Sequence, residues 1–162
     1  SGAVTRAGGT TTEATTTSTT AVDLITIASL SIASTTPIFC VGVARKSTGA
    51  AADAGLGLKL NATVVSEAAT GAFNVWHGNN TANAAVQGSF YFLIPPHDAT
   101  YVRNGWGVGA RGANASAGFS DLRATNDYPN ATTTDVIIRA ISDNGSVTGA
   151  CDEFHVYTYA VS

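Results

Sequence analysis

From residue 21 onward, short apolar runs alternate with clusters of turn-forming residues. The runs are rich in Val, Ile, Phe and Tyr, and Gly, Asn, Asp and Pro separate them, which is typical of β-strands joined by turns. We expect strands near residues 22–33, 38–45, 57–65, 72–76, 88–94, 105–110, 134–142 and 153–161. Only the short Ala-rich segment 48–54 has any helical character. About eight strands without βαβ alternation predict an all-β fold, a jelly-roll-like β-sandwich.

The first 20 residues have a different character. Thr and Gly dominate them and no large aromatic side chain occurs, so this segment cannot form a core by itself. It is either a flexible tail or an extended arm that becomes ordered by lying across a neighbouring subunit, and its β-branched content suits extension. We therefore expect an N-terminal arm over residues 1–20 and one β-sandwich domain over residues 21–162.

Two of the expected strands are apolar on both faces. Phe90 and Phe92 point to one side of their strand, and Tyr91 and Leu93 point to the other. The run 136–141 behaves in the same way. A freestanding sandwich turns polar side chains outward, so these strands predict a second covering layer, which is either a neighbouring subunit or a long loop of the same chain.

The low content of charge favours a structural role. Charged residues make up 12% of the chain and hydrophobic residues 44%, whereas about a quarter charged is ordinary. Such a chain buries surface against partners or is kept in contact with water by Thr, Ser and Asn. The net charge of -3 and the scattered Lys and Arg exclude a basic stripe for nucleic acid. No apolar run approaches the roughly 20 residues of a membrane helix, and the first 20 residues lack the apolar core of a signal peptide.

Catalytic and metal-binding motifs are missing from the sequence. His77, His97 and His155 have no partner at the spacing of metal ligands, and no GxSxG motif occurs. The glycine-rich run 105–112 lacks the Lys and the helix of a phosphate-binding loop. We expect no catalytic residue, no cofactor, no metal and no enzymatic activity. A metal or a hydrolase site assembled from separate loops, and calcium bound at turns such as 143–145, are the alternatives.

The two cysteines, Cys40 and Cys151, both fall in expected strands. Two cysteines are too few for a disulfide framework. We expect two buried free thiols rather than a bridge.

The Thr- and Gly-rich arm, the strand over residues 21–27, the segment 45–63 and the aromatic strands resemble small β-rich virion proteins of tailed bacteriophages, in particular capsid decoration (cement) proteins. The resemblance implies a homotrimer, made in the host cytoplasm, that binds the major capsid protein on the exterior of the virion and clamps neighbouring subunits of the shell. It carries no functional residue over to this chain.

Interface candidates follow from the arm and from the large aromatic residues. The arm would add its backbone to the sheet edge of a neighbour. The candidates are Thr10, Thr11, Thr12, Thr16, Thr17, Trp76, Phe90, Phe92 and Trp106. The first alternative is a tail-fibre or spike domain that binds glycans through loops around Trp76, Tyr101 and Trp106. The second is a surface-layer or filament subunit in which the arm donates a strand head to tail.

Overall fold

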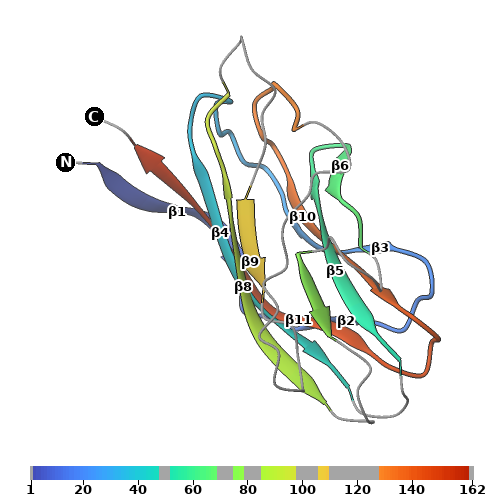
Figure 1. Cartoon of the computed structure of the whole chain (residues 1–162). Helices are drawn as coiled ribbons and strands as arrows, with labels where there is room; N and C mark the ends of the chain where they lie inside the picture. The colour runs from blue at the N-terminus through green and yellow to red at the C-terminus, as the bar shows by residue number, and fades with distance from the viewer. Residues whose placement is uncertain are drawn as a thin grey trace.

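Two antiparallel sheets pack face to face in the computed structural model of the chain (Figure 1). The structure describes residues 2–47, 52–68, 75–78, 85–97, 106–109 and 128–160. These residues contain strands and turns and no helix, which confirms the expected all-β sandwich. A membrane-spanning helix is accordingly not found among them. The possible helix at 48–54 lies largely outside the described residues, and Ala54 belongs to a strand.

One sheet has six strands, in the order β1-β11-β4-β8-β9, with β2 also paired to β11. Its strands are β1 (Ala3–Thr10), β2 (Ala14–Thr16), β4 (Ile38–Lys46), β8 (Val86–Ile94), β9 (Trp106–Gly109) and β11 (Gly149–Ala160). The other sheet has five strands, in the order β3-β10-β5-β6, with β7 paired to β5. Its strands are β3 (Val22–Ile27), β5 (Ala54–Leu60), β6 (Thr63–Ser66), β7 (Trp76–Gly78) and β10 (Val136–Ser142).

The expected strand over residues 57–65 is a hairpin, which corrects the sequence prediction. The chain reverses at Asn61, where φ is +52°, so that Leu60 pairs with Thr63. Asn is among the few residues that adopt this left-handed conformation readily. Its side-chain Oδ1 also accepts hydrogen bonds from the backbone N–H groups of Thr134 at 2.8 Å and Asp135 at 3.2 Å. These bonds fix the turn against the start of β10.

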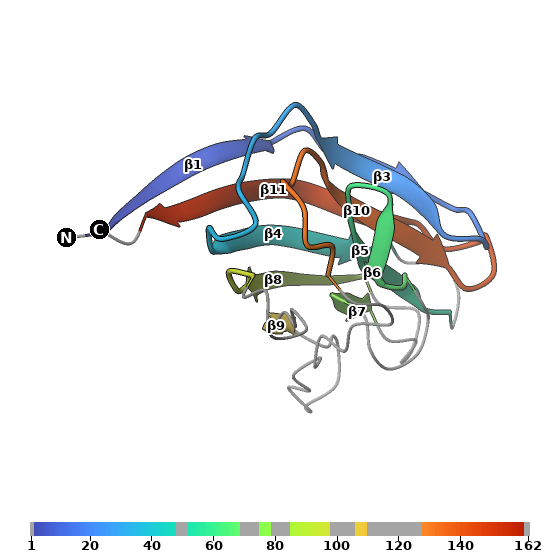
Figure 2. The same cartoon turned by 90° about the horizontal axis from the view of Figure 1, so that it is seen from above.

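The N-terminal arm is extended and belongs to the six-stranded sheet. Both β1 and β2 pair antiparallel with β11 of the same chain. Gly8 lets β1 pack closely against β3 of the other sheet, because a Cβ atom there would lie 2.5 Å from Cγ2 of Ile27. Beyond the sandwich, β1 and the end of β11 continue as a two-stranded ribbon that carries both ends of the chain (Figure 2).

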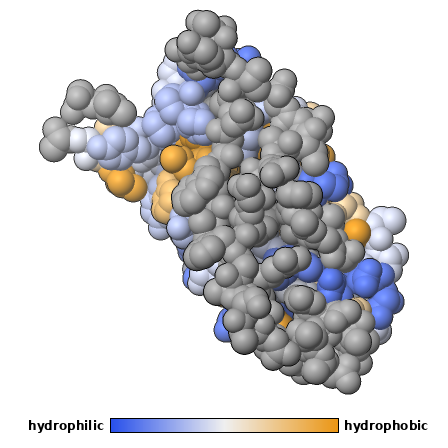
Figure 3. Space-filling view, viewed as in Figure 1, coloured by the Kyte–Doolittle hydropathy of each residue, from blue (hydrophilic) through white to orange (hydrophobic). Residues whose placement is uncertain are grey.

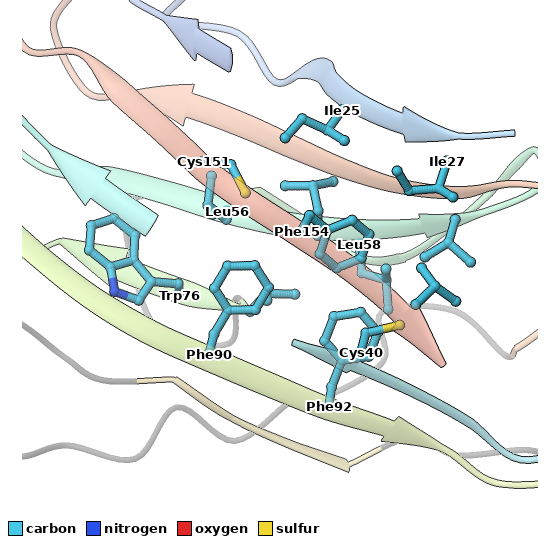
Figure 4. Packing of buried hydrophobic residues seen from close by; sticks show 14 of the residues in the cluster. Ile25, Ile27, Cys40, Leu56, Leu58, Trp76, Phe90, Phe92, Cys151 and Phe154 are labelled. Carbon is cyan, nitrogen blue, oxygen red and sulfur yellow. The ribbon is translucent and has the colours of Figure 1, made fainter. Parts of the chain in front are cut away.

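The core lies between the two sheets and is centred on stacked aromatic rings (Figure 4). The ring of Phe154 in β11 lies 6.2 Å from those of Phe90 and Phe92 in β8. Leu56 and Leu58 of β5 belong to the same buried cluster. Along β8 the buried positions alternate with exposed ones, which is the period of a strand with one face in the core.

The alternation in β8 predicts very different costs for two adjacent truncations. Phe92 is fully buried and Leu93 is 41% exposed. Phe92→Ala should lower the free energy of unfolding by about 3–5 kcal/mol, and Leu93→Ala by about 1 kcal/mol or less. Urea denaturation of the two variants measures both values. Equal losses would contradict the assignment of the two faces.

Cys40 and Cys151 are free and fully buried, which confirms the expected thiols. Burial raises the pKa of Cys40 well above its ordinary value, and burial together with the nearby Asp152 carboxylate raises the pKa of Cys151 to about 12. Because the thiolate is the reactive form, both groups are protonated and shielded in the folded chain.

We therefore expect neither thiol to react with a maleimide in the folded protein between pH 7 and pH 9. A raised pKa means that little thiolate forms in this range, and burial blocks access to it. Mass spectrometry should find both thiols modified after the protein is unfolded in guanidinium chloride. Rapid modification of either one in the folded state would contradict its burial.

Candidate functional site

The outer face of the six-stranded sheet carries the large exposed apolar side chains of the described residues. Phe39 is 37% exposed, Tyr91 38%, Leu93 41% and Tyr159 42%. They gather toward the end of the sheet from which the ribbon projects, and Figure 3 shows hydrophobic surface there beside strands β4 and β8. We call this surface the apolar face and define it by Val4, Phe39, Val41, Tyr91, Leu93, Tyr157 and Tyr159.

Strand register brings these side chains together. Phe39 of β4 lies directly opposite Leu93 of β8 on one side and Tyr157 of β11 on the other. Directly opposite residues of an antiparallel pair share a face and touch. The rings of Phe39 and Tyr91 lie 6.1 Å apart and are tilted by 45°. The strands β4, β8 and β11 thus build one continuous apolar surface, and Val4 of β1 lies opposite Tyr159 at its end.

Polar groups border the apolar face along β1 and β11. The Arg6 guanidinium donates to Nδ1 of His155 at 3.2 Å, and Nε2 of His155 lies 3.6 Å from the Glu153 carboxylate. The ring of His155 also lies 6.5 Å from that of Tyr157. An apolar centre with a polar rim is the usual arrangement of a protein interface.

The opposite end of the same sheet is charged. Arg45 donates to Asp152 at 3.1 Å and also to Glu13, and Gln87 donates to Asp152 at 3.0 Å. Hydrogen bonds with Asp152 and then with Glu13 raise the pKa of Arg45 above its ordinary value. The outer face is therefore divided into a charged half and an apolar half.

The outer face of the five-stranded sheet carries an ionic network instead. Asp23 accepts hydrogen bonds from Lys59 at 2.7 Å and Arg139 at 3.1 Å, and Arg139 also donates to Glu67 at 2.8 Å. These groups are partly solvated. On β10 Ile137, which belongs to the second apolar face, is buried within the chain itself, so at this position the chain covers the strand without a neighbouring subunit.

The ionic network predicts a measurable dependence of stability on pH. The Lys59 hydrogen bond, together with the charges of Lys59 and Arg139, lowers the pKa of Asp23 below 3.8. A lowered pKa means that the contribution is present above the ordinary value and lost as the pH falls through the folded-state pKa. Asp23→Asn should therefore lower the free energy of unfolding at pH 6 by less than about 1 kcal/mol, since the pair is exposed. The difference between Asp23→Asn and the unmodified protein should vanish near pH 2, as denaturation curves at both pH values would show.

The aromatic residues that the sequence suggested as interface candidates lie either in the core or in β9. Trp76, Phe90 and Phe92 are buried between the sheets. In this fold they anchor the core and offer no surface to a partner, which corrects the sequence expectation. Trp106 begins β9, where its backbone pairs with that of Leu93 beside the apolar face. Tyr101, from the glycan-binding alternative, lies outside the described residues.

The threonine candidates all lie on the arm. Thr10 ends β1 and Thr16 ends β2, while Thr11 and Thr12 connect the two strands and Thr17 follows β2. Thr11, Thr12 and Thr17 are exposed. The arm pairs with its own chain, and its solvent-facing threonines are available to a partner.

His77 has a carboxylate partner that sequence spacing could not reveal. Its Nε2 lies 2.8 Å from Oδ2 of Asp53, and the His77 side chain is 4% exposed. Asp53 precedes β5 and His77 lies in β7, so strand pairing brings them together across 24 residues. The other two histidines lie elsewhere: His97 follows β8 and His155 belongs to β11. The described residues contain no group of three or more His, Cys, Asp or Glu that could hold a metal ion.

A shallow hollow of about 410 Å³ lies at the base of the ribbon. Its lining comes from β1, from β11 and from the connection between β3 and β4, and consists of Ala7, Ser29, Leu30, Ser31, Ile32, Ala33, Thr36 and Thr158. Its side chains are hydroxyl-bearing or aliphatic, with no charged or aromatic group among them. Such a lining lacks the titratable groups that a catalytic site requires.

No protein-family model matches the chain, and no curated protein sequence matches it. Among solved structures, the metal-free carbohydrate recognition domain of Emp46p is 11% identical with a TM-score of 0.38, over 78% of this chain and 72% of that chain. VP2 of the infectious bursal disease virus subviral particle is 9% identical with a TM-score of 0.36, over 97% of this chain and 32% of VP2. The CBM22-1 xylan-binding domain of Paenibacillus barcinonensis Xyn10C is 10% identical with a TM-score of 0.32, over 81% of this chain and 60% of that chain.

Proposed function

We propose that this chain is a structural virion protein, a capsid decoration subunit that binds the major capsid protein and further copies of itself on the outside of the shell. The apolar face is the observation that carries this proposal. Contiguous exposed apolar surface with a polar rim marks sites of protein–protein contact. Tyr and Phe are among the residues enriched at such sites, and Phe39, Tyr91 and Tyr157 supply them here.

The distribution of charge supports binding through one side of the molecule. The five-stranded sheet turns an ionic network outward, around Asp23 and Arg139, and this surface is adapted to water. The apolar half of the six-stranded sheet keeps its charged groups at the rim, at Arg6 and Glu153. A subunit of this kind sits on a shell with one face bound and the other solvated.

Weak individual contacts are sufficient for this function. A shell presents the same binding surface many times, and a linked set of subunits binds with high effective concentration. The apolar face therefore needs to supply only a modest affinity for each copy. The resemblance of the arm and the aromatic strands to capsid decoration proteins points in the same direction.

A glycan-binding domain for host recognition is the second candidate, because exposed aromatic rings are also platforms for sugars. Phe39 and Tyr91 are neighbours on the apolar face. Their rings are tilted by 45° to each other, so they do not form one flat platform. The aliphatic side chains of Leu93 and Val41 beside them fit a protein partner better than a sugar.

Two lysines placed on the apolar face should abolish binding to capsids. Tyr91→Lys with Leu93→Lys puts charges where the partner's apolar surface would exclude water, which is costly. The matched control is Thr26→Lys with Ala28→Lys, at exposed positions of and after β3, which adds the same charge on the other sheet. Capsids of the virus that encodes the chain, stripped of this protein and sedimented with each variant, should retain the control and lose the double variant by at least tenfold.

The outcomes separate the two candidate functions. Equal retention of both variants would show that the apolar face does not bind the shell. Saccharide binding on a glycan array that disappears in the Tyr91→Lys, Leu93→Lys variant would favour the second candidate. Circular dichroism of each variant confirms that the sandwich is folded before binding is compared.

A further inference from the structure

The strand β1 is an open edge of the six-stranded sheet. It pairs with β11 on one side, and Gly2 to Arg6 are exposed. In an antiparallel pair, alternate residues direct both their N–H and their C=O away from the partner strand. Over Ala3 to Arg6, no backbone hydrogen bond joins these outward groups to another described segment.

This edge carries few of the features that usually prevent strand addition. Natural edges carry Pro, charged side chains or bulges, and Arg6 is the one charged residue of this stretch. The stretch Ala3–Arg6 contains no Pro and no Lys, and the irregularity in β1 falls after Arg6. The Arg6 side chain is directed along the sheet toward His155. Four consecutive residues thus present a regular, open strand edge.

The ribbon is also incomplete as a sheet. Where it projects beyond the sandwich (Figure 2), it consists of β1 and the end of β11 alone. Two strands in water are marginally stable, whereas three or more with a shared apolar face are stable. Val4 and Tyr159 lie opposite each other on the ribbon, with Val4 65% exposed and Tyr159 42% exposed. The ribbon therefore has an open backbone edge and exposed apolar side chains, and a further strand could cover both.

We infer that a second copy of this chain fills this edge, with its β1 antiparallel to the first. The four strands then follow the order β11-β1-β1-β11 across a two-fold axis, and the two six-stranded sheets become one. This inference rests on the proposed function, since it names the self-association through which the decoration subunits join. It also assigns a two-fold contact, in place of the three-fold contact that the resemblance implies.

Charge selects the antiparallel arrangement. With the axis at Val4, this residue lies opposite Val4 of the partner subunit, and Arg6 lies opposite Gly2 of the partner subunit. A parallel arrangement in register would set the two Arg6 side chains beside each other, and like charges directly opposite are destabilising. The remaining residues of the edge are small or β-branched, which suits close strand pairing.

The two-fold axis has a consequence for the apolar face. An axis between two antiparallel neighbours runs perpendicular to the sheet, so each face of one copy continues into the same face of the other. The outer faces of both copies point the same way, and Val4 and Tyr159 of each join one surface. The pair would therefore meet a flat partner with two apolar faces at once, which raises its avidity.

Spin labels near the axis test this arrangement. Thr5→Cys and, as a second site, Ala3→Cys give single exposed thiols, because Cys40 and Cys151 are buried. Ser146→Cys, exposed beyond β10, is the control. Pulsed electron paramagnetic resonance should show a short distance at residues 3 and 5, since each lies next to the residue on the axis, and none at 146. Light scattering of the unlabelled protein should give twice the 16.4 kDa chain mass.

Edge variants provide the second measurement. Ala3→Lys with Thr5→Lys places like charges close to the axis. The double variant should raise the dissociation constant of the dimer at least tenfold and leave the circular dichroism spectrum unchanged. A monomer at all concentrations, or an oligomer with no short distance at residues 3 and 5, would overturn the inference. Either result leaves capsid binding by the apolar face intact, since the lysine pair at 91 and 93 tests that separately.

Discussion

The structure depends on the packing of β4, β8 and β11 against the opposite sheet through one of their two faces. Phe154 stacks against Phe90 and Phe92 inside the sandwich, and this fixes which residues remain outside. Because side chains alternate with a period of two, burying Phe92 turns Tyr91 and Leu93 to the outer face, where both are exposed. The apolar face is thus set by the same register that forms the core, and neither can change without the other.

Much of the fold could be predicted from the sequence, and the limits have physical causes. The alternation in 88–94 identified a strand with two apolar faces, but it could not say which face is buried, since Phe and Leu fit either. The turn at Asn61 was missed because the residues around it are as apolar as a strand, and the decisive signal is a backbone conformation held by contacts to Thr134 and Asp135. The arm is extended, but it pairs with β11 of its own chain, whereas the sequence suggested that an extended arm would lie across a neighbouring subunit.

The candidate site was only partly predictable for a related reason. Tyr91 and Leu93 were recognised as a second apolar face, whereas Trp76 and Phe90 were expected at an interface and lie in the core. Phe39 and Tyr157 could have been found by applying the same alternation to 38–45 and 153–161. What the sequence could not supply is the pairing of these strands as neighbours, which alone makes one surface of them. The Asp53–His77 pair could not be predicted either, because it depends on the pairing of β5 with β7.

The arm is paired along one of its edges and open along the other. Pairing with β11 uses only one edge of β1, and the polar, β-branched composition of the arm gives it little apolar surface to bury. Its order comes from backbone hydrogen bonds with β11. Such bonds form equally well with a strand of the same chain or of another chain. A segment held in this way keeps the second edge open, and at Val4 it extends the apolar face to the end of the ribbon. Pairing of the arm within its own chain would therefore favour the proposed second copy, because a strand already fixed in register loses little further conformational entropy when another strand is added.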